Sequence, residues 1–173
     1  MFSGMGELYR LVYTGGKTDT SYDCRFALGV KKAIVEADEF EAYDRMSMNY
    51  GHTIGHALEA YFDYRVPHGI GVMIGIIVEN RLGNARLPTS LRKFESILLA
   101  KIVQWDTTFL QNLKHIDQGI FPYLLNDKKT CGNVLTYAYL KKPGQMYFKT
   151  MDMTDENKQK ILDVLHAVGE LNA

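Results

Sequence analysis

The sequence predicts a mainly α-helical domain with one small β-hairpin. Apolar residues recur at helical spacing over most of the chain, and Gly- or Pro-containing breaks separate the segments. Two short runs rich in Val, Thr and Tyr flank a Pro-Gly turn near the C-terminus, which is typical of a hairpin. With 173 residues and no repeat or linker-like tract, we expect a single domain over residues 1–173.

The helical segments are separated by clear start and stop signals. Residues 70–82 are apolar nearly all round, which predicts a buried helix with Gly83 as its C-cap. Thr154 is a good N-cap for the last helix, since two acidic residues follow it. The expected strands are 134–139 and 146–148, and the other expected helices are 4–13, 26–40, 44–63, 91–105 and 121–125.

The composition excludes several classes of protein. The formal net charge is zero, so the chain lacks the basic field of a nucleic-acid-binding protein. The most apolar stretch, residues 70–78, is too short to span a membrane, and no secretory signal is recognisable. The two cysteines form no CxxC pair. We therefore expect a cytoplasmic protein with neither nucleic acid nor membrane as a partner.

The histidines are the strongest sign of chemistry. Three of the five fall within seventeen residues, at His52, His56 and His68. The first two are four residues apart, so on a helix they share one face. Both can then bind one metal ion, or one can bind the metal while the other transfers a proton. Gly51 and Gly55 are costly inside a helix, which indicates that another element packs closely beside these histidines.

The motif around these histidines resembles that of dehydroquinate synthases and related sugar phosphate cyclases. The run from Asn49 to Glu59, NYGHTIGHALE, followed by His68-Gly, is similar to the histidine motif of that family. Residues 4–10 resemble its Gly-x-Ala-Glu-x-x-Lys segment, and residues 31–49 its run into the histidine motif. Residues 126–129 resemble its later Asp-Lys-Lys motif. The matching segments are spread over most of the chain and follow the order found in the family. The resemblance also implies the helical fold of the family's C-terminal domain.

The resemblance implies a metal site and a substrate site in this one domain. The metal would be zinc, or another divalent ion such as cobalt. The implied residues are Glu7, His52 and His68 as metal ligands, His56, Lys31 and Arg10 as catalytic residues, and Arg45, Asn49, Lys128 and Lys129 as substrate-binding residues.

The implied activity is that of a 3-dehydroquinate synthase-like phosphate lyase of the shikimate pathway, which leads to aromatic amino acids. It converts a seven-carbon keto-acid sugar phosphate to a carbocycle with loss of phosphate, using zinc and NAD. In the family an N-terminal domain binds NAD, and we expect that domain to be absent here. The isolated chain is then expected to need that domain or a partner chain for activity, and to form a homo-oligomer through the face that the domain would cover.

Three local differences from the family pattern keep other interpretations open. The segment between Glu7 and Lys31 is shorter, Arg10 stands in place of lysine, and Ile70 stands where the family usually has Glu. The chain is then a fragment of a two-domain enzyme, a separate subunit, or a degenerate domain that binds metal or protein without catalysis. Another sugar phosphate cyclase, an iron-dependent alcohol dehydrogenase and a metal-free interaction domain are further alternatives.

Overall fold

The computed structural model describes residues 29, 32, 36, 48–125 and 133–171. Contacts within the chain define two compact units, residues 1–49 and 50–173, and each is described by itself. In the first unit Gly29, Lys32 and Glu36 are helical, in agreement with the helix expected over 26–40. The expected helix over 4–13 lies outside the described residues, and the assignment of 1–173 to a single domain stays a prediction.

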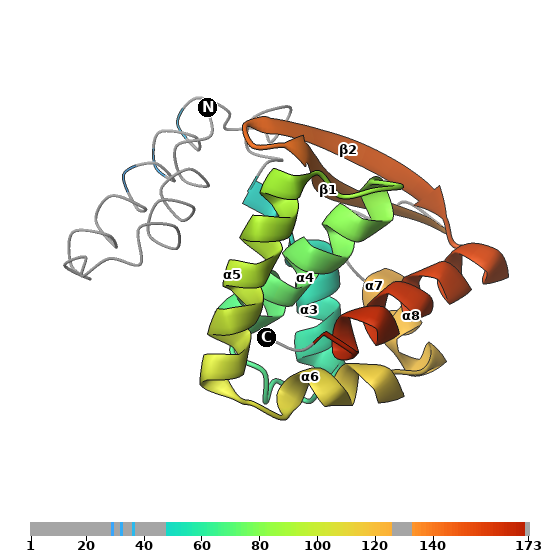
Figure 1. The fold of residues 1–173 in the computed structure, drawn as a ribbon. Coiled ribbons are helices and arrows are strands. Elements are labelled where there is room, and N and C mark those ends of the chain that lie inside the picture. The colour runs from blue at the N-terminus through green and yellow to red at the C-terminus, as the bar shows by residue number, and fades with distance from the viewer. Residues whose placement is uncertain (1–28, 30–31, 33–35, 37–47, 126–132, 172–173) are drawn as a thin grey trace. The chain divides into compact units, whose positions relative to one another are not determined.

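The second unit is mainly helical with one hairpin, which confirms the predicted fold class (Figure 1). No helix in the described ranges is both long enough and apolar enough to cross a membrane. The elements are α3 (His52–Tyr61), α4 (His68–Gly83), α5 (Thr89–Trp105), α6 (Phe109–Asn112), the 3-10 turns Leu113–His115 and Gln118–Ile120, α7 (Phe121–Leu125), β1 (Val134–Lys142), β2 (Gln145–Asp152) and α8 (Asp155–Gly169).

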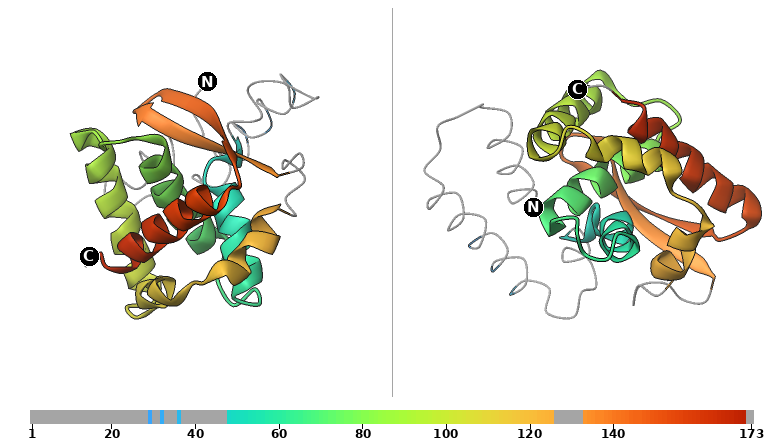
Figure 2. Two further views of the ribbon diagram at one scale, coloured as in Figure 1. Left: turned by 90° about the vertical axis from the view of Figure 1, so that its right-hand side faces the viewer. Right: turned by 90° about the horizontal axis from the view of Figure 1, so that it is seen from below.

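Helix α4 is the central element of this unit. It packs against α3, α5, α8 and β1, and Figures 1 and 2 show it enclosed by these neighbours. Most of its apolar residues are buried, including Ile74, Ile77 and Val78, whereas Val72 and Met73 are half-buried. An apolar surface that runs all round a helix can be removed from water only if neighbours cover every face. The predicted buried helix is therefore confirmed.

The hairpin is covered on one strand and exposed on the other. Strands β1 and β2 pair antiparallel around the turn at Pro143 and Gly144, as predicted. Strand β1 packs on α4, whose Asn80 Oδ1 accepts a 2.9 Å hydrogen bond from the Leu140 amide. Asn84 Nδ2 donates to the Leu140 carbonyl at 2.9 Å. Side chains of α4 thus satisfy backbone groups of β1 that β2 does not reach.

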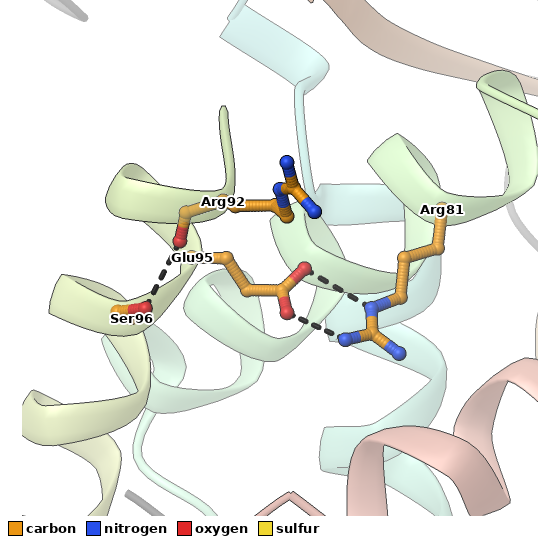
Figure 3. Close-up of polar contacts among 4 residues, drawn as sticks. All are labelled: Arg81, Arg92, Glu95 and Ser96. Atoms are coloured by element: carbon orange, nitrogen blue, oxygen red, sulfur yellow. Dashed lines mark hydrogen bonds and ion pairs between the residues drawn. The ribbon is translucent and has the colours of Figure 1, made fainter. Parts of the chain in front are cut away.

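A two-pronged ion pair joins α4 to α5 (Figure 3). Arg81 Nε donates to Glu95 Oε2 at 3.0 Å, and Arg81 Nη2 donates to Glu95 Oε1 at 2.5 Å. The planar fork of arginine matches a carboxylate in this way, which fixes the relative orientation of the two side chains. Beside it, Ser96 Oγ donates to the Arg92 carbonyl within α5.

Two boundaries at glycines differ from the sequence prediction, and both strands extend beyond the expected ranges 134–139 and 146–148. The described part of the expected 44–63 helix becomes helix α3 only at His52, because Gly51 has a φ of 76° and stands in the left-handed region as the N-cap. Gly83 is the last residue of α4, and the C-cap is Asn84 with an extended backbone. A Cβ on Gly83 would lie 2.2 Å from the Tyr139 ring. Close packing of that ring, and not a left-handed cap, explains this glycine.

Candidate metal centre

Helices α3 and α4 are in contact through backbone atoms. A Cβ built on Gly55 would lie 3.0 Å from the Gly71 carbonyl carbon, and one on Gly75 would lie 1.9 Å from the Gly51 oxygen. Such contacts are possible only where side chains are missing. The element predicted to pack closely beside Gly51 and Gly55 is therefore α4. Because α4 starts at His68, this packing brings His68 next to the histidines of α3.

The three histidines of the motif form one cluster. The ring centroids of His52 and His56 are 5.3 Å apart, those of His52 and His68 are 5.3 Å apart, and those of His56 and His68 are 5.5 Å apart. One potential ligand atom from each residue lies within 4.8 Å of those of the other two. His52 is half-buried, whereas His56 and His68 are exposed. The cluster thus lies at the surface of the second unit, within reach of a ligand from solvent.

Hydrogen bonds distinguish the three rings. His52 Nδ1 lies 3.0 Å from the Tyr50 carbonyl oxygen, and His68 Nδ1 lies 2.8 Å from Glu59 Oε1. A carbonyl oxygen or a carboxylate can only accept, so Nδ1 carries the proton and Nε2 is the nitrogen that can bind a metal. No hydrogen bond within the described residues holds the ring of His56. The three rings thus form a donor set that fits a metal ion, and hydrogen bonds orient two of them, His52 and His68.

Comparison with known proteins places the chain in a family. Residues 15–130 match the family model described as 3-dehydroquinate synthase C-terminal. The chain belongs to this family. The match includes the histidine cluster and every helix from α3 to α7.

Curated 3-dehydroquinate synthases resemble this C-terminal domain over most of its length. The enzyme of Lactiplantibacillus plantarum is 36% identical over 132 residues, which are 75% of this chain and 35% of the relative. That of Streptococcus equi is 35% identical over 142 residues, 82% of this chain and 38% of the relative. That of Mesorhizobium japonicum is 29% identical over 153 residues, 85% of this chain and 40% of the relative. The chain thus spans about two fifths of the length of these relatives or less.

A buried carboxylate of α4 holds the start of α3. Glu79 of α4 is fully buried, and its two oxygens accept from Gly51 N at 2.8 Å and Ile54 N at 3.3 Å. Helix α3 has no side-chain cap of its own. A negative charge at a helix N-terminus satisfies exposed amides and interacts favourably with the helix dipole. Because the two amides flank His52, Glu79 also fixes the backbone that carries this histidine.

Two buried tyrosines surround that carboxylate. Burial, opposed by a contact with Asn80 and aided by the charge of Glu79, raises the pKa of Tyr50. Burial, together with Tyr139 and Glu79, raises the pKa of Tyr137 to about 12. Both phenols therefore stay neutral near pH 7, and neither adds a second negative charge beside Glu79.

Glu59 and Glu79 were not identified from the sequence, although each left a signal. Glu59 lies seven residues after His52, on the same face of α3, and can therefore reach the histidine cluster. Glu79 is a charged residue that directly follows the apolar run 70–78, and such a residue is rarely buried without a partner. Ile70, which stands where the resembled family usually has Glu, is buried, and the carboxylate that contacts His68 comes from Glu59 of α3.

Most of the other predicted site residues cannot be placed against this cluster. Asn49 is described and half-buried, in a short 3-10 turn with Met48, but it belongs to the first unit. The roles predicted for Asn49, for the other site residues and for the three histidines stay predictions. The residues that lie outside the described ranges are Glu7, Arg10, Lys31, Arg45, Lys128 and Lys129.

Proposed function

We propose that this chain is the metal- and substrate-binding part of a 3-dehydroquinate synthase. The reaction proposed is conversion of a seven-carbon keto-acid sugar phosphate to a carbocycle with loss of phosphate. Family membership supports this proposal, and the paired Nδ1 hydrogen bonds of His52 and His68 carry it. Those bonds leave the Nε2 atoms of both rings unprotonated and oriented for a metal. A plain helical interaction domain would not need such an arrangement.

The proposed metal ligands are Glu7, His52 and His68. One carboxylate oxygen and two imidazole nitrogens suit a catalytic zinc, which keeps positions open for substrate oxygens. Zinc, or cobalt in its place, would supply a positive charge that polarises those oxygens. The exposed location of His68 at the start of α4 leaves the site accessible to a substrate from solvent.

The proposed role of His56 is proton transfer. Its ring lies beside both anchored histidines but has no hydrogen bond of its own among the described residues. A ring nitrogen of His56 is thus available to accept a proton from a substrate hydroxyl and to return it. A histidine fixed at Nδ1 and bound to metal at Nε2 has no such freedom.

Cationic residues are proposed to bind the substrate anions. A sugar phosphate that also carries a carboxylate has two anionic groups, and arginine and lysine side chains bind such groups by charge-assisted hydrogen bonds. NAD is proposed to be bound by a further domain or by a partner chain, and to carry the hydride. The proposed residues are Arg45, Asn49, Lys128 and Lys129 for substrate binding, with Lys31 and Arg10 in catalysis.

The metal content of the purified chain tests the proposal. About one zinc per chain is expected in the wild type, and much less in His52→Ala and Glu7→Gln. His115→Ala is the matched control, since this exposed histidine lies in the 3-10 turn Leu113–His115 and is not a member of the cluster, and this variant should keep the metal. Full metal retention in His52→Ala would contradict the proposed site. Phosphate release from the seven-carbon substrate, with NAD and an NAD-binding domain added, then separates a synthase from a metal-binding domain without catalysis.

A further inference from the structure

Glu59, which contacts His68, is the residue beside the histidine cluster to which the proposed function assigns no role. Glu59 Oε1 of α3 lies 2.8 Å from His68 Nδ1, and this bond crosses from one helix to the other. The Glu59 side chain is 13% exposed, whereas that of His68 is 58% exposed. The imidazole is therefore largely in solvent, and the carboxylate beneath it is the polar group that can fix its orientation.

The carboxylate of Glu59 is itself held in place by the packing of the helices. A Cβ on Gly71 would lie 3.2 Å from both Glu59 Cγ and Glu59 Oε1. The missing side chain at Gly71, three residues after His68, thus provides the space in which the carboxylate lies. A side chain confined in this way loses little further freedom when it accepts a hydrogen bond. The contact is therefore part of the α3–α4 interface and not a chance surface pair.

The two anchored histidines differ in what holds them. His52 donates to a backbone carbonyl, which is neutral and fixed by the chain, whereas His68 donates to a carboxylate. A charged acceptor at Nδ1 makes Nε2 a stronger donor to a metal and also selects the Nδ1–H tautomer. In water the Nε2–H tautomer would compete, and it cannot bind a metal through Nε2.

We infer that Glu59 is a positioning residue of the metal centre, which holds His68 in the Nδ1–H tautomer and aims its Nε2 at the metal. This inference rests on the proposed metal site. Glu59 of α3 thus determines which ring nitrogen of His68 on α4 carries the proton. Metal affinity should therefore depend on Glu59, although Glu59 does not touch the metal.

The first experiment needs no metal. Long-range proton–nitrogen correlation spectra of ¹⁵N-labelled chain, at about pH 8.5 where imidazoles are mostly neutral, report the tautomer of each histidine. The wild type should show His68 with its proton on Nδ1, and Glu59→Ala should shift the population toward Nε2–H. Asp63→Asn, an exposed carboxylate near the end of α3, is the control and should leave His68 unchanged. An Nε2–H tautomer of His68 in the wild type would overturn the inference.

The second experiment measures Co²⁺ affinity by competition with a chromophoric chelator, together with the visible spectrum of bound Co²⁺. Glu59→Ala should bind roughly 10–100-fold more weakly with an altered spectrum. Glu59→Gln should lose less, because its amide oxygen can still accept from Nδ1–H. Equal affinity and an unchanged spectrum in Glu59→Ala would overturn the inference while the metal site stands. Absence of Co²⁺ binding in the wild type would instead refute the proposed function, whatever the tautomer result.

Discussion

Helices α3 and α8 begin in different ways. Helix α8 starts at Thr154, whose hydroxyl accepts from Asn157 N at 3.3 Å, with Asp155 and Glu156 in its first turn. Helix α3 starts at Gly51 in the left-handed region, and its first amides are satisfied by Glu79 from α4. One helix start is thus built from neighbours in sequence, and the other from a residue 28 positions away.

The difference matters because α3 carries two of the clustered histidines. A local cap stabilises its own helix wherever that helix lies. A cap from another helix forms only when both helices are packed together, so it couples the start of the helix to tertiary structure. The geometry of His52 therefore depends on α4, whereas α8 could be capped in isolation.

The largest loss of stability is expected from substitution of Gly51, the N-cap of α3 whose backbone lies in the left-handed region. Gly51→Ala places a Cβ 2.5 Å from the Val72 oxygen and 2.8 Å from Ile76 N. Left-handed strain of roughly 1–2 kcal/mol and overpacking of about 1–3 kcal/mol should together lower the free energy of unfolding by about 2–5 kcal/mol. Urea unfolding followed by circular dichroism measures the change.

Gly69→Ala is the control for that experiment. A Cβ at Gly69 meets nothing within 4 Å, and its backbone is helical within α4. Alanine should therefore leave the free energy of unfolding unchanged or raise it by up to about 1 kcal/mol. Equal stability of the Gly51 and Gly69 variants would contradict the close contact of α3 with α4.

The next largest loss of stability is expected when the charge of Glu79, which caps α3 from α4, is removed. In Glu79→Gln one oxygen becomes an amide that donates, so either Gly51 N or Ile54 N faces another donor in a buried site. The free energy of unfolding should fall by about 1–3 kcal/mol. The exposed Glu170, at the C-cap of α8, gives the control Glu170→Gln, for which no measurable change is expected.

Loss of the local cap of α8 should have a smaller effect. Thr154→Ala removes the acceptor of the Asn157 amide and should lower the free energy of unfolding by about 1 kcal/mol. Thr154→Ser keeps the hydroxyl and should restore most of the loss. A larger loss for Thr154→Ala than for Glu79→Gln, in the same urea series, would reverse the ranking of local and distant caps.

The smallest effect is expected at the start of α6 and should depend on pH. The Asp106 carboxylate accepts from the Thr108 amide and hydroxyl and from Phe109 N, which holds its pKa below the usual value of 3.8. The folded-state pKa is thus the lower one, so the contribution to stability is present above the unfolded pKa and is lost as pH falls through the folded pKa. Asp106→Asn should be less stable than the wild type at pH 7, and the difference should narrow near pH 3 in urea unfolding.

Sequence reasoning succeeded where the physical signal is local. The Thr154 cap, the Pro143-Gly144 turn and the apolar helix around Ile74 are each determined by residues within a few positions, and all three are confirmed. It was wrong on the helix boundary at Gly51, which is the left-handed N-cap of α3 and not an interior residue, and on the cap at Gly83, where the Tyr139 ring packs instead. The close packing beside Gly51 was predicted, but the element that provides it was not.

The histidine cluster was predicted only in part for the same reason. The HxxxH spacing places His52 and His56 on one face of a helix without further information. Which carboxylate lies behind His68 depends on how α3 and α4 pack, and Glu59 becomes evident only once Gly71 is seen beside it. Glu7 lies outside the described residues, so its predicted part in the site stays a prediction.

The glycine contacts between α3 and α4 have a consequence for how much the protein can vary. Because Gly51 meets Gly75 and Gly55 meets Gly71 through backbone atoms, van der Waals contact between the two backbones, and not side-chain volume, sets the distance between the two helices. Leucines and isoleucines elsewhere in the core can then be exchanged for one another while the separation of His52 from His68 is preserved. Tolerance should thus be wide over most of the domain and almost nil at these four glycines.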